Sequence, residues 1–316
     1  SVQSLKTEFG IIDHLACASL GLAVFFVLPK YESRGTFVQN RVDKCIQMVN
    51  EYKKFLSSGF FDNVAMKSFG KGVIKYVGSN VVGDFREFPG DVMFVEEMDD
   101  CDQLNLKFAE DRLRASNYQF KRFIGNPTVE DFGINSAYKK SDQRHWHIIC
   151  QSCKEPVMLD WFNCVVNTIL DSDGIPKDYE LLDSDSKEVR EPRPICRKCG
   201  NPCDRFSDGV WIAQNPDVLV EGYLLNMLQS KQNALIDMWF RFKDAMGDPS
   251  IMEKFYNSEL GLPYTAPNVK LTVATLKACS EVLPYSFDIT SFGGCVKTVG
   301  KKTCSMGVDV GKFFDV

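Results

Sequence analysis

The sequence has no run of about 18 apolar residues, the length that a helix needs to cross a bilayer. The nearest candidate, residues 14–30, is divided by Gly21 and reads as a helix followed by a strand. We therefore expect no membrane span. A secretion signal is also missing, and no internal repeat is visible. The first residues already fall inside a motif, so we expect that the natural N-terminus lies upstream.

An excess of positive charge is missing too. The 37 lysines and arginines stand against 42 acidic residues, which gives a net charge of −5. A globally basic nucleic-acid-binding protein is therefore not indicated, although a local basic face is enough to hold phosphate. Residues 67–75, 112–122 and 297–302 could form such a face, and a solvated surface is the alternative for each. The length of 316 residues allows roughly two domains.

Cysteine is abundant, with twelve residues of which eight are scattered. A disulfide scaffold would be short, secreted and evenly rich in cysteine, so metal binding explains the dense group better. Two C-x₂-C pairs can supply four thiolates to a tetrahedral Zn²⁺ ion: Cys150, Cys153, Cys196 and Cys199. A long hairpin insert would explain the gap of about forty residues between the pairs. Four thiolates leave no open position, so the zinc would stabilise the fold.

Other assignments of this cysteine group stay open at this point. Disulfides or free thiols are the alternative to zinc, and Cys203 is a spare thiol. One of His145 and His147 could replace a cysteine ligand, but these residues alternate across an expected strand, so only one can face the site.

Apolar runs alternate with helical patterns in the first half of the chain. Residues 23–29, 92–95 and 120–125 read as buried strands, whereas residues 36–56, 104–116 and a segment starting near Lys6 have helical spacing. This alternation predicts an α/β fold with a parallel sheet covered by helices on both sides. Residues 170–194 read as an acidic loop or ragged hairpin, and residues 233–247 read as an amphipathic helix.

Phosphate-binding chemistry is indicated where Lys6 and Thr7 begin a helix. Backbone N–H groups at a helix N-terminus favour phosphate, the lysine adds charge, and the hydroxyl can hold Mg²⁺. Leu5 stands where a phosphate-binding loop has glycine. An ordinary capped helix start is the alternative.

Two carboxylates, Glu96 and Glu97, follow a buried strand directly. The first could hold Mg²⁺ and the second could orient or deprotonate a water molecule. Open parallel sheets bind ligands at this edge. Asp99 and Asp100 are better explained as N-terminal caps.

Two further segments carry polar residues at strand positions. In residues 123–128, Asn126 or Thr128 could sense phosphate, and a plain turn is the alternative. Asp309 lies inside the apolar segment of residues 307–311, where a carboxylate needs a partner or a metal, and a surface strand end is the alternative.

Taken in order, these pieces resemble the large terminase subunit of tailed bacteriophages in its lambda-like, GpA-type form. The matching stretches run from the first residue to the last: QSLKTE, AVFFVLPKYESRGTFVQNRV, VGSN, VMFVEEMD, FIGNPT, CQSC…CRKC, GYLLNMLQS, FYNSELGLPY and GVDVG. The resemblance implies a P-loop ATPase that drives viral DNA into a prohead, and a nuclease that cuts concatemeric DNA.

The resemblance also implies roles for residues, by position. The phosphate loop would include Gln3, Ser4, Lys6 and Thr7. Glu96, where the family usually has aspartate, would hold Mg²⁺, and Glu97 would be the catalytic glutamate. Residues 126–128, with Asn126 and Thr128, would couple hydrolysis to motion. Asp309 would be the first metal-binding acid of the nuclease, whose other acids would lie beyond Val316. An arginine is also needed, and the candidates are Arg34, Arg41, Arg86 and Arg114.

The domain boundaries implied are an ATPase core at 1–144, a zinc-ribbon-like insertion at 145–210, a helical segment and linker at 211–300, and the first strand of an RNase H-like nuclease at 301–316. The implied cofactors are ATP, Mg²⁺ and structural Zn²⁺. The implied partners are double-stranded DNA, the small terminase subunit, the portal protein and further copies in a ring. The implied location is the host bacterial cytoplasm, transiently at the prohead portal. A helicase-like ATPase of another family and a non-enzymatic zinc-ribbon DNA-binding module are the alternatives.

Overall fold

The structure is a computed structural model that describes residues 6–56, 60–86, 88–174, 176–183 and 191–265, and the backbone of residues 309–310 and 314–315. The chain divides into two units, Ser1–Thr265 and Ala266–Val316. Among the described residues, no helix is both long enough and apolar enough to span a bilayer.

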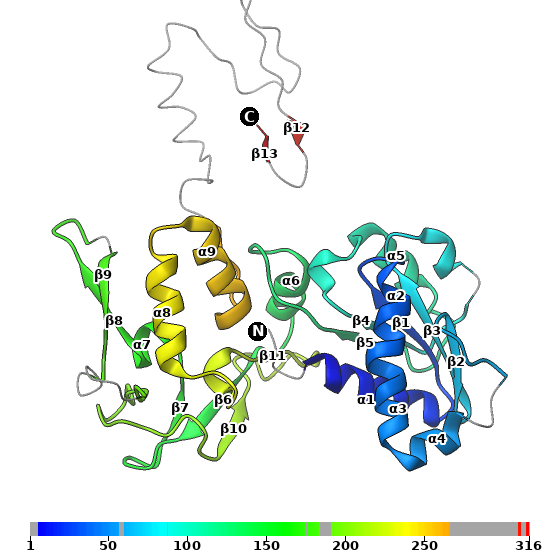
Figure 1. The fold of residues 1–316 in the computed structure, drawn as a ribbon, viewed down its shortest axis with the longest axis horizontal. Coiled ribbons are helices and arrows are strands. Elements are labelled where there is room, and N and C mark those ends of the chain that lie inside the picture. The colour runs from blue at the N-terminus through cyan, green and yellow to red at the C-terminus, as the bar shows by residue number, and fades with distance from the viewer. Residues whose placement is uncertain are drawn as a thin grey trace, which may run out of the picture. The chain divides into compact units, whose positions relative to one another are not determined.

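A five-stranded sheet forms the first half of the larger unit (Figure 1). Its strand order is β2 (Met66–Phe69), β3 (Gly72–Gly78), β1 (Ala23–Leu28), β4 (Val92–Val95) and β5 (Phe120–Phe123). Four strands from β3 to β5 are parallel, which confirms the predicted parallel sheet. The antiparallel edge strand β2 was not predicted.

Helices cover both faces of this sheet, as the alternation of strands and helices predicted. On one face, Phe26 and Phe94 pack with Leu15 of α1 (Lys6–Ser19). On the other face, Phe25 and Met93 pack with residues of α5 (Gln103–Asp111). Successive residues of β1 and β4 therefore point into two different cores, and this is why both strands are apolar throughout.

The helix expected over residues 36–56 is broken. It forms α2 (Ser33–Phe37), the π-helical turn η1 (Val38–Val42), α3 (Asp43–Met48) and α4 (Asn50–Leu56). Val49 has extended backbone angles, φ −117° and ψ 116°, which suit a β-branched residue. The break redirects α4 so that Tyr52 and Leu56 reach the core on the α1 face.

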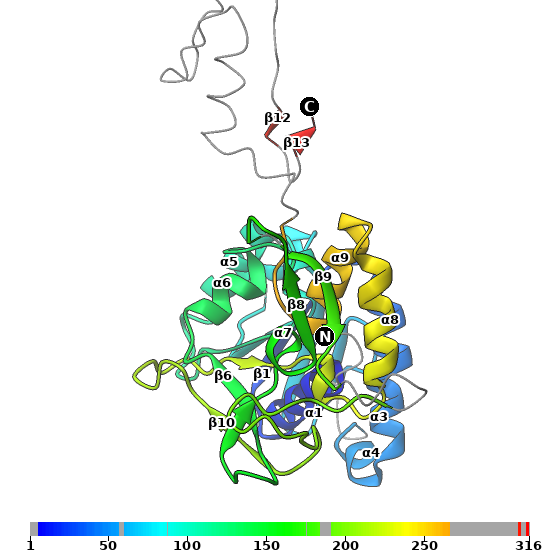
Figure 2. The same ribbon diagram turned by 90° about the vertical axis from the view of Figure 1, so that its left-hand side faces the viewer.

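The second half of the larger unit has its own core, built around Trp161, Phe242 and Phe255. Figure 2 shows α8 (Leu235–Ala245) beside α9 (Pro249–Lys254), and the expected helix at 233–247 is thus confirmed. Strands β8 (Val166–Leu170) and β9 (Pro176–Leu181) form a hairpin, and β9 lies in the acidic segment of residues 170–194. The remaining elements are β6 (Arg144–Ile149), β7 (Pro156–Met158), β10 (Gly209–Ile212), β11 (Tyr223–Leu224), α6 (Gly133–Lys139), α7 (Trp161–Cys164), η2 (Val82–Phe85), η3 (Met98–Asp100), η5 (Met227–Gln229) and η6 (Phe255–Leu260).

The smaller unit contributes two short strands, β12 (Asp309–Val310) and β13 (Phe314–Asp315), which pair antiparallel. An RNase H-like strand is not shown by this pairing. The side chain of Asp309 lies outside the described residues, so its metal-binding role stays a prediction. The four predicted domains also stay predictions.

Candidate functional site

Three segments that are distant in the sequence meet at the carboxyl edge of the large sheet. Glu96 directly follows β4, and its N–H donates to Val27 O over 2.9 Å. Gly125 and Asn126 follow β5, the neighbouring parallel strand. The N-terminus of α1, with Lys6 and Thr7, reaches both segments. The start of α1 thus lies at the same sheet edge as Glu96.

Lys6 lies against the segment after β5. Its Nζ donates to Gly125 O at 2.9 Å and to Asn126 Oδ1 at 2.7 Å. Burial lowers the pKa of Lys6, whereas the charges of Glu97 and Glu96 raise it. The lysine is therefore a partly desolvated cation beside two carboxylates.

Glu96 is buried and lies within reach of the helix start. The Thr7 hydroxyl donates to its Oε1, while its Oε2 has no hydrogen-bond partner among the described residues. Burial raises the pKa of Glu96, and the hydrogen bond from Thr7 opposes that rise. A buried carboxylate oxygen without a donor, next to a hydroxyl, is a donor set that suits Mg²⁺. The charge of Arg41, which pairs with Glu8 on α1, also acts on this carboxyl.

Glu97 adopts the left-handed conformation, with φ 47° and ψ 61°. This conformation is uncommon for a residue other than glycine, and it is often found at functional sites. Glu97 lines a cavity of about 290 Å³ together with Asn126 and Thr128. The opposite wall comes from Ser250, Lys254 and Asn257 on α9 and η6. Asn257 belongs to FYNSELGLPY, one of the stretches that carry the family resemblance, but no role was predicted for it.

Asp99 has a different role from the cap that its position predicted. Asp102 caps α5, since its Oδ1 accepts from the N–H groups of Leu104 and Asn105. Asp99 instead accepts from both the N–H and the hydroxyl of Thr128, each at 2.8 Å, and from Ile134 N at 2.6 Å. The carboxylate thus ties the segment after β5 to the start of α6.

The four predicted cysteine ligands come together in the second half of the unit. All four sulfur atoms lie within 4.8 Å of one another. Cys150 and Cys199 have their sulfurs 3.8 Å apart, and Cys153 and Cys196 have theirs 3.9 Å apart. A disulfide needs about 2 Å, whereas a tetrahedral site with Zn–S bonds of about 2.3 Å needs roughly 3.8 Å between sulfurs. The spacing therefore fits a metal site.

Both C-x₂-C turns have the same backbone geometry. In each, the N–H of the first cysteine donates to the carbonyl five residues later, Glu155 O or Asn201 O. In each, the residue after the second cysteine is left-handed, Lys154 at φ 62° and Gly200 at φ 74°. Hydrogen bonds from the backbone N–H groups of Cys153 and Ser152 lower the pKa of Cys150 to about 7. Two equivalent turns that bring four thiols together suit a metal that binds thiolates.

The alternative ligands have other hydrogen-bond partners. Cys203 donates to Pro194 O at 3.3 Å. His145 Nε2 is paired with the Tyr138 hydroxyl at 3.2 Å, and His147 Nδ1 is paired with His145 O. The remaining predicted site residues, Gln3 and Ser4, lie outside the described residues.

A parallel sheet with Glu96 and Glu97 at its carboxyl edge, and with Lys6 of α1 beside that edge, is typical of α/β proteins that bind phosphate groups. A family profile described as "Phage terminase large subunit gpA, ATPase domain" matches residues 10–211, more than half of the chain. The chain therefore belongs to that family. The matched region contains both glutamates, the segment after β5 and all four clustered cysteines.

Other comparisons add little to the family assignment. The search of curated proteins gave no match. Among solved structures, the ATPase domain of the Thermus phage P74-26 large terminase is similar at 13% identity and a TM-score of 0.30. The similarity covers 45% of this chain and 61% of that chain, so this chain spans about three fifths of that domain.

Proposed function

We propose that this chain is the ATP-hydrolysing motor part of a terminase that packages double-stranded viral DNA. The observation that carries the proposal is the meeting of Lys6, Thr7 and Glu96 at the edge of the sheet, where Glu97 lines the adjoining cavity. Family membership supports this function and argues against a helicase-like ATPase of another family.

In this proposal the position of each residue at the sheet edge sets its role in binding or hydrolysing ATP. Lys6 and the N–H groups at the start of α1 bind the phosphates of ATP. Thr7 and Glu96 hold Mg²⁺, which when bound neutralises charge on the phosphate oxygens. Glu97 orients the attacking water and accepts its proton. Asn126, in the segment after β5, accepts a hydrogen bond from Lys6. A movement of Lys6 on phosphate binding would therefore shift this segment and change the contact between Asp99 and Thr128.

Further parts of the proposal follow from the family. Gln3 and Ser4 would complete the phosphate loop, and Asp309 would begin the nuclease. The four-cysteine group would hold structural zinc. The portal protein, the small terminase subunit and other copies of the chain would assemble with it at the prohead, in the host cytoplasm.

The proposal is tested with Glu97→Gln in protein made from the complete reading frame. We expect ATP hydrolysis to fall roughly 100- to 10,000-fold, because general-base catalysis typically contributes that much. Nucleotide affinity should change little, because the isostere keeps the shape of the site. Lys6→Ala should instead weaken ATP binding.

Glu110→Gln serves as the matched control, since Glu110 lies on α5 and forms an ion pair with Lys121 of β5, away from the proposed site. Its hydrolysis rate should equal that of the unaltered protein. If the unaltered protein bound no ATP, the motor assignment would fail, and the non-enzymatic zinc-ribbon module would become the better explanation.

A further inference from the structure

A row of aromatic side chains crosses the second sheet, away from the residues used above. Trp146 of β6 stands directly opposite Trp211 of β10, and their ring centroids are 5.4 Å apart. The Tyr223 ring of β11 lies 5.0 Å from the Trp211 ring. In each pair the rings meet edge to face, at 64° and 86°. Three strands therefore contribute to one aromatic surface.

The position of Trp146 depends on a glycine in the neighbouring strand. A Cβ atom added at Gly209 would lie 2.6 Å from two carbons of the Trp146 indole. The indole therefore lies close against the β10 backbone, and only glycine leaves that space. This packing fixes one aromatic wall without the help of any ligand.

A cavity of about 340 Å³ opens beside these rings. We call it the aromatic pocket; its lining includes Trp146, Trp211, Phe206, Gln229 and Lys231. Phe206 is 40% exposed, and the Arg205 guanidinium lies over its ring, 4.3 Å from the ring centre. The Gln229 side-chain oxygen accepts from Asn226 N, which leaves its NH₂ group to donate to a ligand. Planar apolar walls with one amide donor suit a planar heterocycle.

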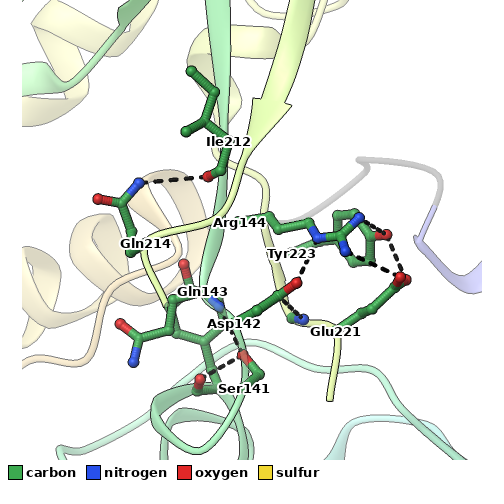
Figure 3. A network of polar contacts seen from close by, with 10 residues as sticks. Ser141, Asp142, Gln143, Arg144, Ile212, Gln214, Glu221 and Tyr223 are labelled. Carbon is green, nitrogen blue, oxygen red and sulfur yellow. Dashed lines mark hydrogen bonds and ion pairs between the residues drawn. The ribbon is translucent and has the colours of Figure 1, made fainter. Parts of the chain in front are cut away.

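Most cations near the pocket are already engaged. Figure 3 shows the Arg144 guanidinium held by Asp142 at 2.6 Å, by Glu221 at 3.1 Å and by the Tyr223 hydroxyl at 3.1 Å. Arg205 is buried and donates to main-chain carbonyls, including Leu228 O at 3.2 Å.

Lys231 differs from both arginines. It is exposed, its Nζ lies 5.8 Å from the centre of the Phe206 ring, and it forms no ion pair within the described ranges. A free ammonium at the rim of an aromatic pocket complements a ligand that carries one phosphate next to a planar base.

We propose that the aromatic pocket binds one unpaired base of a single-stranded nucleic acid, with the adjoining phosphate at Lys231. The bases of an intact duplex are stacked and paired, so their faces cannot enter the pocket. Translocation along a duplex does not require such a site. The inference therefore goes beyond the proposed function, and it depends on none of the residues at the ATPase edge.

The test is a binding titration with fluorescein-labelled dT10, followed by anisotropy. Four unlabelled competitors are compared: dT10, an abasic ten-unit strand with the same phosphates, a ten-base-pair duplex, and thymidine monophosphate. We expect dT10 to compete best. Phe206→Ala should weaken dT10 binding roughly 5- to 150-fold, the range measured for loss of one base–aromatic stack.

Phe240→Ala is the matched control, because Phe240 is an exposed phenylalanine on α8 outside the pocket. It should leave dT10 affinity unchanged. Trp211→Ala should weaken binding and Trp211→Phe should restore most of it. The logarithm of the dT10 affinity should fall with the logarithm of the salt concentration, and Lys231→Ala should make this slope less steep by about 0.7. Circular dichroism of each variant checks that the fold is retained.

Several results would overturn the inference. Equal competition by the abasic strand would reduce the interaction to phosphate charge. Equal competition by the duplex, or by thymidine monophosphate alone, would remove the single-strand assignment. Absence of dT10 binding would end the proposal, as would an equal loss of affinity in Phe206→Ala and Phe240→Ala. The ATP assay above is separate, so failure here leaves the motor proposal standing.

Discussion

Asp99→Asn should destabilise the protein although it changes only one atom of the side chain. The two carboxylate oxygens of Asp99 receive three hydrogen bonds, two from Thr128 and one from Ile134, and the residue is 4% exposed. Asparagine has one oxygen and one NH₂ group. Whichever way the amide turns, a donor of this side chain must face another donor.

The size of the effect follows from these contacts. Hydrogen bonds to a charged acceptor contribute about 1.5–3 kcal/mol each, and a buried unsatisfied donor costs about 1–3 kcal/mol. Asparagine keeps either the two bonds from Thr128 or the one from Ile134, and it cannot keep all three. We therefore expect the free energy of unfolding to fall by about 2–4 kcal/mol.

The space around Asp99 gives no room for a rearrangement. A Cβ atom at Gly133, where φ is 47°, would lie only 2.0 Å from Asp99 Oδ1. The neighbouring backbone therefore passes close to the carboxylate, and an amide group cannot move away from Ile134 N without displacing it.

Urea unfolding followed by circular dichroism measures this difference, with Asp100→Asn as the matched control. Asp100 is the adjacent carboxylate and is exposed, so its replacement should change stability by less than about 0.5 kcal/mol. If Asp99→Asn and Asp100→Asn had the same unfolding midpoint, the inferred link between the segment after β5 and α6 would be wrong.

Two further predictions concern metal and pH. Metal analysis of protein purified without chelator should find one zinc per chain. The Cys196→Ser variant should lose this zinc, and the Cys203→Ser variant should keep it. Absence of zinc from the unaltered protein would contradict the proposed site. His14 is fully buried against Phe26, and burial lowers its pKa to about 4, so the fold favours neutral histidine. Keeping His14 neutral contributes roughly 3 kcal/mol to the free energy of unfolding. This contribution should be complete above pH 6.5 and should be lost as pH falls toward 4. Urea unfolding of the unaltered protein and of His14→Gln checks this, since the variant should show the smaller loss of stability.

Several features were predictable because they are local in the sequence. The continuous apolar runs of β1 and β4 reflect burial on both faces, because alternate residues of each strand point into two different cores. The C-x₂-C spacing predicted the two cysteine turns, since each turn is closed by hydrogen bonds within six residues. The position of Glu96 and Glu97 after a buried strand was also readable, because a strand delivers the next residues to the sheet edge.

Other features depended on which distant segments become neighbours. The sequence placed a lysine at a helix start, but only the strand order brings it to Asn126, 120 positions away. A local pattern assigned Asp99 to the helix that follows it, whereas the fold gives its oxygens to Thr128 and Ile134. The antiparallel edge strand β2 and the break at Val49 were missed for the same reason.

The sequence by itself determined that β1 and β4 are buried strands and which cysteines act as pairs, because periodicity and short spacing are set by neighbouring residues. The burial predicted for residues 120–125 was wrong: β5 is an edge strand of the sheet, and Phe120, Lys121 and Arg122 are exposed. Only the tertiary structure decided the partners of Lys6, the role of Asp99 and the existence of the aromatic pocket. These depend on strand order and register, through which residues such as Trp146 and Trp211 face each other across 65 positions of sequence. These contacts join residues that are far apart in the sequence, so no local sequence pattern predicts them.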